Sequence, residues 1–134
     1  MRPRNDKLLI INVGIQLTSP PFYILLHYAP PSGAPVSIAV LLYLLDPDVK
    51  GEFKLFMRFR KDWNPVGDAD AIEVLQSLAD DLYAKTVELG PRLLLEYLED
   101  TLSNSLLLSE RFKAMETEDP ISHLNDLFHR YVGN

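Results

Sequence analysis

The feature that most constrains this chain is the ten-residue segment Val36–Leu45, which is apolar on both faces when it is read as a strand. A bilayer-spanning helix needs about 20 apolar residues, so this segment is too short to cross a membrane. Because successive side chains of a strand point to opposite faces, both faces of this strand need apolar cover. We therefore expect a central strand that is covered on both sides or locked in a dimer.

Three other segments also predict strands, and each is bounded by proline, glycine or aspartate turn residues. They are Leu8–Leu17, Phe22–Tyr28 and Glu52–Arg60. In the last segment, apolar and charged residues alternate. One face has Phe53, Leu55, Met57 and Phe59, and the other has Glu52, Lys54, Arg58 and Arg60 together with Phe56. We expect the first face to be buried in the core and the second to be exposed to solvent. The short connections favour an antiparallel meander.

The second half of the sequence has helical periodicity. Asp70 and Glu73 have the spacing of a capping box, and Asp68 is a rival N-cap. That helix ends at Gly90-Pro91, where a second begins, and Asp119-Pro120 starts a last helix. The apolar stripes of the three are Ile72, Leu75, Leu78, Ala79, Leu82 and Leu89, then Leu94, Leu95, Leu98 and Leu102, then Ile121, Leu124, Leu127, Phe128 and Tyr131.

These elements predict one compact α+β domain over residues 1–134, a length that suits a single domain. We expect a four-stranded antiparallel meander followed by two to three helices packed on one face, with a short extra strand near residues 105–109. Helices on one face leave the other face of the sheet with an exposed apolar patch. Because such patches usually mark interfaces, we also expect a homodimer.

Charge and composition narrow the function classes. The net charge is -6, with +3 in residues 1–66 and -9 in residues 67–134, which argues against generic binding of nucleic acid or anionic membranes. The absence of cysteine excludes a disulfide scaffold, a thiol nucleophile and a thiolate zinc site, and it fits a reducing cytoplasm. The basic N-terminus before Leu8–Leu17 resembles a secretory signal, but Asn12 and Gln16 interrupt the run. We expect a cytoplasmic protein without a membrane partner.

The sharpest candidate site is a basic strand end with a nearby aromatic side chain. Its residues are Lys54, Arg58, Arg60, Lys61 and Trp63. A basic surface with an aromatic platform holds phosphates and stacks bases, so these residues form a candidate anion-binding site. Two other interpretations compete with it, a solvated sheet face and a face paired with the acidic helices. Trp63 is then either a binding platform or a lid over the end of the sheet.

Other polar groups do not form a catalytic or metal-binding pattern. Acidic residues near Asp68 fit a helix N-terminus, where the helix dipole favours them. His123 and His129 lack the i,i+4 spacing that metal binding prefers, and His27 has no nucleophile beside it in the sequence. No nucleophile elbow, phosphate-binding glycine loop or dinucleotide fingerprint occurs. We assign no catalytic, cofactor or metal residue.

Two parts of the chain carry a resemblance to a known family. One is Phe22-Tyr23 and His27-Tyr28-Ala29-Pro30 followed by Val36–Tyr43, and the other is Leu108–Phe112 with Asp119-Pro120 and Leu124–Val132. Over residues 22–132 this pattern resembles a bacterial family of domains of unknown function. The family usually carries an acidic residue and Asn-x-Gly where this chain has Pro35–Ala39. The resemblance implies a bacterial origin and one compact domain, and it implies no established chemistry.

The sequence therefore predicts a non-catalytic protein-protein interaction module, of an adaptor-like, chaperone-like or inhibitor-like kind. This function rests on the acidic, leucine-rich helical half and on the lack of a catalytic pattern. The alternative is a phosphate- or nucleic-acid-binding protein or enzyme that uses the basic residues Lys54–Lys61. The two hypotheses differ in which surface binds, since the alternative needs the basic side chains to converge.

Overall fold

The computed structural model describes residues 20–31, 33–101 and 106–133, and its centre is an antiparallel sheet. Strands β1 (Phe22–Tyr28), β2 (Val36–Leu45) and β3 (Phe53–Phe59) pair consecutively as a meander. The short strands β4 (Leu106–Leu108) and β5 (Phe112–Lys113) both pair antiparallel with β1. The predicted strands at 22–28 and 36–45, the strand at 52–60 to within a residue at each end, and the short strand near 105–109 are confirmed.

Helices follow the strands along most of the second half of the chain. They are the 3-10 helix η1 (Asn64–Val66) and the α-helices α2 (Ala69–Leu89), α3 (Pro91–Thr101) and α4 (Pro120–Tyr131). The side chain of Asp68 accepts hydrogen bonds from the amides of Asp70 and Ala71, so Asp68 is the N-cap of α2. Asp119 caps α4 in the same way through the amide of Ser122. None of the helices in the described residues has the length and apolarity needed to cross a membrane.

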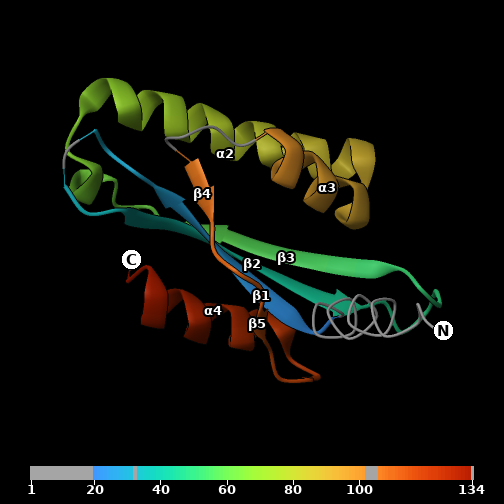
Figure 1. Cartoon of the computed structure of the whole chain (residues 1–134). Helices are drawn as coiled ribbons and strands as arrows, with labels where there is room; N and C mark the ends of the chain where they lie inside the picture. Colours follow the sequence, from blue (N-terminus) through green and yellow to red (C-terminus); the bar gives the residue numbers. More distant parts are fainter. Residues whose placement is uncertain (1–19, 32, 102–105, 134) are drawn as a thin grey trace, which may run out of the picture.

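The sheet lies between two helical layers, with α2 and α3 on one face and α4 on the other (Figure 1). The α+β class and the antiparallel sheet are confirmed, but the helices do not share one face as expected. The helix α4 contacts both β2 and β3 and covers the part of the expected solvent-exposed face that holds Arg58 and Arg60, whereas Glu52 and Lys54 are exposed as predicted. The centre of β2, Ile38–Tyr43, is thus covered on both sides within one chain, and the expected exposed sheet face behind the dimer prediction is covered by α4 over this part of the strand.

The predicted strand Leu8–Leu17 and the stripe residue Leu102 lie outside the described residues. Among the described residues, β2 pairs along one side of β1, while β4, Ser109 and β5 bond to its other side.

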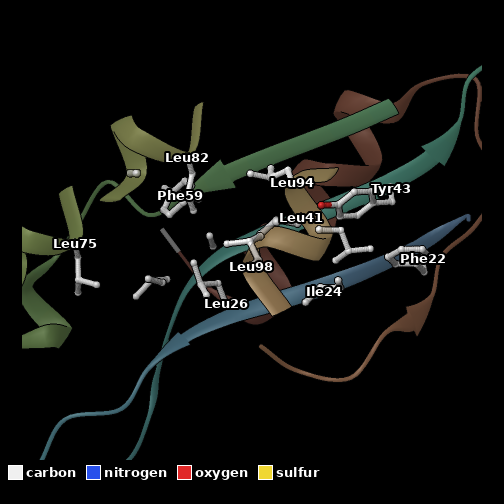
Figure 2. Close-up of a cluster of buried hydrophobic side chains, with 14 of the residues drawn as sticks. Phe22, Ile24, Leu26, Leu41, Tyr43, Phe59, Leu75, Leu82, Leu94 and Leu98 are labelled. Atoms are coloured by element: carbon white, nitrogen blue, oxygen red, sulfur yellow. The ribbon is translucent and has the colours of Figure 1, made fainter. Parts of the chain in front are cut away.

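The larger core lies between the sheet and the helices α2 and α3 (Figure 2). Phe22, Ile24 and Leu26 of β1 face it, and the ring of Phe22 stacks on that of Tyr43 at 5.0 Å between centroids. A β-bulge in β2 turns both Ile38 and Ala39 toward this core, because Ala39 pairs with Leu26 while Ser37 pairs with His27. The helices contribute Leu75, Ala79, Leu82, Leu94, Leu95 and Leu98.

The smaller core lies between the sheet and α4. Its buried residues are Tyr23, Leu25, Val40, Leu42, Ala114, Leu124, Leu127, Phe128 and Val132. The predicted apolar face of α4 is confirmed for Leu124, Leu127 and Phe128. Ile121 is instead 54% exposed, and Tyr131 is 37% exposed and contacts Tyr23 of β1.

Candidate functional site

The five residues of the predicted anion-binding site do not share one surface. Lys54 and Arg58 of β3, and Arg60 one residue beyond it, lie on the side of α4, from the start of the helix to its end. Lys61 is exposed beyond the end of the strand. Trp63 is buried in the larger core, on the other face of the sheet, so it offers no exposed platform for stacking a base.

Arg58 is held by α4. Its Nη1 donates a hydrogen bond to Oδ1 of Asn125 at 2.7 Å, and its guanidinium carbon lies 4.0 Å from the centre of the Phe128 ring. A guanidinium at this distance over an aromatic face gains a cation–π attraction. Arg58 thus acts as a packing residue between strand and helix.

Arg60 is buried, with 7% of its surface exposed, and its guanidinium meets only main-chain oxygens in its described hydrogen bonds. It donates to the carbonyl groups of Ser37 at 3.0 Å, Asp62 at 2.7 Å and Val132 at 3.0 Å. Burial lowers the pKa of Arg60, while the Asp62 charge opposes that shift. Because Val132 is the C-cap of α4, the positive charge lies at the negative end of the helix dipole. The side chain is committed to holding α4 on the sheet.

His27 and Ser37 form the described pair that most resembles a base and a nucleophile. Ser37 Oγ and His27 Nδ1 are 3.0 Å apart, and burial lowers the pKa of His27. The two residues are direct cross-strand partners next to the β-bulge, a position that accounts for their contact without a reaction. Neither residue lines the groove described below. No group of three or more potential metal ligands occurs among residues 20–31, 33–101 and 106–133.

A second polar pair fastens the last turn of α4. The hydroxyl groups of Tyr23 and Tyr131 lie 2.8 Å apart, and their rings lie 5.6 Å apart between centroids. Burial, together with this hydrogen bond, raises the pKa of Tyr23 to about 12, whereas the same hydrogen bond lowers the pKa of Tyr131. Either hydroxyl group can be the donor in this hydrogen bond. The pair joins the C-terminal end of α4 to β1.

The candidate functional site is a groove of about 480 Å³ between the β2–β3 turn and the N-terminus of α4. Three stretches of sequence build it: the start of β1, the β2–β3 hairpin, and the segment that leads into α4. Its lining residues are Pro21, Leu44, Leu45, Pro47, Lys54, Phe56, Glu116, Thr117, Glu118 and Pro120. The floor is apolar, since Leu44 and Phe56 also pack against the smaller core.

Local hydrogen bonds fix both walls of this groove. In the β2–β3 turn, Oδ1 of Asp46 accepts hydrogen bonds from the amides of Asp48 at 2.8 Å and Val49 at 3.3 Å. On the opposite wall, the amide of Asp119 donates to Oγ1 of Thr117 at 3.0 Å, and Asp119 caps α4. The groove is therefore shaped by turn and cap chemistry rather than by loosely held loops.

Large apolar side chains are exposed along and beside this groove. Leu45 lines it with 54% of its surface exposed, and Val49, Met115 and Ile121 lie close by in sequence to lining residues and are 50%, 65% and 54% exposed. Glu116 and Glu118 line the same groove and are exposed, opposite the single lining cation Lys54. The site thus combines an apolar floor with a predominantly acidic rim.

Sequence reasoning missed this groove. The signals for it were Phe56 among the polar residues of its strand and the acidic run just before Asp119-Pro120. They lie far apart in the sequence, and only the packing of α4 against β3 brings them together.

No family model matches the sequence, and no curated protein or solved structure matches it significantly. The function is therefore argued from the geometry of the site. The resemblance of residues 22–132 to a bacterial domain family therefore stays a prediction.

Proposed function

We propose that this protein is a non-catalytic interaction module that binds a segment of another protein in the groove between the β2–β3 turn and α4. The observation that carries this proposal is the apolar floor of the groove together with the exposed Leu45 at its edge. Fully burying a leucine side chain is worth about 1.5–3 kcal/mol relative to leaving it in water. Binding energy at interfaces concentrates in a few such anchor residues that meet in a pocket.

The partner in this proposal is a different protein rather than a second copy of this chain. The homodimer prediction depended on an uncovered sheet face, and α4 covers that face. The anion-binding alternative depended on a convergent basic surface, and Arg58 and Arg60 are instead engaged with α4. A cytoplasmic location, favoured by the acidic chain without cysteine, completes the proposal.

A peptide-display selection on the immobilised full-length chain tests this function. Selected peptides should bind the protein in solution, as measured by fluorescence anisotropy. Leu45→Ser should weaken that binding about tenfold, which corresponds to about 1.4 kcal/mol. Val74→Ser is the matched control, because Val74 is 66% exposed but lies on α2, across the sheet from the groove.

The proposal fails if no peptide is enriched, or if both substitutions weaken binding equally. Thermal unfolding of each variant separates a binding effect from an unfolding effect, since both positions are exposed and both substitutions should change stability little.

A further inference from the structure

We infer that the segment bound in the groove has an apolar centre flanked by lysine or arginine. This inference rests on the proposed function and adds the chemistry of the partner. It follows from the charges around the groove, taken together with its apolar floor.

The charges on the rim of the groove are mostly negative. Glu116 and Glu118 line one wall and are exposed. In the opposite turn Asp48 and Lys50 are both exposed, so their charges offset one another and the acidic character comes from the wall with the two glutamates. Lys54 is the single cation among the lining residues. Asp119 is at the N-terminus of α4, where its side chain accepts a hydrogen bond from the Ser122 amide. Its carboxylate therefore already compensates the positive end of this helix dipole.

The rim therefore discriminates between partners by charge. Acidic groups beside a bound apolar segment would face like charges at short range, whereas basic groups would face Glu116 and Glu118. Such charge pairs at an interface rim contribute mainly to specificity and to the association rate. Because the pairs are exposed, salt should screen them.

The floor of the groove supplies the other half of the selection. Leu44 and Phe56 are part of the smaller core, and Leu45 and Pro47 extend the same apolar surface outward. A bound segment with charged residues alone would leave the apolar floor of the groove exposed to water. The groove thus selects an apolar anchor and a basic flank in the same segment.

Two labelled peptides test this inference on the full-length protein. One has a Leu-Ile-Phe-Leu core with lysines on both sides, and the other has glutamate in place of each lysine. We expect the lysine peptide to bind at least about tenfold more tightly at low salt, with the difference shrinking as salt approaches about 200 mM. Equal binding of the two peptides, or preference for the glutamate peptide, would overturn the inference.

A matched pair of double variants locates the effect. Glu116→Gln with Glu118→Gln should reduce the preference for the lysine peptide several-fold. Glu73→Gln with Glu96→Gln removes the same net charge from exposed positions on α2 and α3, and it should leave the preference nearly unchanged. Equal effects of both double variants would assign the preference to overall net charge rather than to the groove.

A photoreactive amino acid in place of Leu45 distinguishes the possible occupants. A crosslink to the bound lysine peptide, competed by unlabelled peptide, supports the inference. Crosslinks confined to residues 1–19 of the same chain, or to a second copy of the chain, would overturn it. Failure of the lysine peptide combined with successful display of peptides of other composition rejects only this inference, whereas failure of every peptide rejects the proposed function.

Discussion

The two faces of the sheet are closed in different ways. Under α2 and α3 the buried side chains are aliphatic and aromatic, and the hydroxyl group of Tyr43 is buried there without a described hydrogen-bond partner. The arginines that pack on this face, Arg92 over Phe53 and Arg111 over Phe22, are exposed or half-buried. Under α4 the apolar contacts are fewer, and polar groups join them. Arg58 packs on Phe128, Arg60 binds the end of the helix, and Tyr23 bonds to Tyr131.

This difference shows that a strand face rich in arginine is not necessarily exposed to solvent. Arginine carries a long apolar stem and a planar group that packs on aromatic rings, so it covers apolar surface while its N–H groups find acceptors. For Arg58 the acceptor is the side-chain amide of Asn125. For Arg60 the acceptors are the main-chain carbonyls of Ser37 on β2, Asp62 after β3 and Val132 at the end of α4.

The largest loss of stability is expected in the larger core. Leu98→Ala removes a side chain that is 1% exposed, so the free energy of unfolding should fall by about 2–5 kcal/mol. Leu93→Ala is the matched control, because Leu93 lies on the same helix and is 51% exposed. Urea denaturation followed by circular dichroism measures both. Similar losses for the two variants would show that α3 does not close this core.

Truncating a buried side chain of the smaller core should lower the free energy of unfolding somewhat less. Leu127→Ala removes a side chain that is 3% exposed, and we expect a loss near the lower end of the range of about 2–5 kcal/mol, since a thinner layer collapses more easily around a cavity. Ile121→Ala, at a position that is 54% exposed, should change stability far less. A shift of the melting temperature under two degrees for Leu127→Ala would mean that α4 is a detachable tail.

The sequence predicted the face under α2 and α3 better than the face under α4. Periodic apolar residues such as Phe53, Leu55, Leu94 and Leu98 report a core directly, and all of them pack there. The charges of Lys54 and Arg58 predict a solvent-exposed face, which holds for Lys54 but not for Arg58, whose guanidinium packs on α4. The groove was not predicted, because it exists only after α4 covers that same face. The strand β5 is two residues long, too short to leave a pattern.

Arg60 tests whether the polar contacts of the smaller core are structural. Arg60→Ala leaves buried carbonyl groups without their donor, which costs about 1–3 kcal/mol in the free energy of unfolding. Arg60→Lys keeps the charge but loses the fork that reaches three carbonyls, so it should restore only part of the loss. Lys61→Ala, at the exposed neighbouring position, should stay within about 0.5 kcal/mol of the wild type. Full rescue by lysine would mean that charge at the end of α4, rather than the hydrogen-bond pattern, holds the helix.

The smallest expected effect is a pH dependence from His27, on the same face as Arg60. Burial lowers the pKa of His27 below its usual value of 6.5, so the unfolded chain binds the proton more readily than the folded chain. Stability is therefore at its full value above about pH 6.5 and falls as the pH drops through the folded-state pKa. His27→Gln should flatten the decline in the free energy of unfolding between about pH 7 and pH 5, whereas His129→Gln, at an exposed position on α4, should leave it unchanged. Urea denaturation at each pH measures how steeply the free energy of unfolding changes with pH in the wild type and in the two variants. If the wild type and His27→Gln decline in parallel, the hydrogen bond between Ser37 and His27 does not depend on a neutral imidazole.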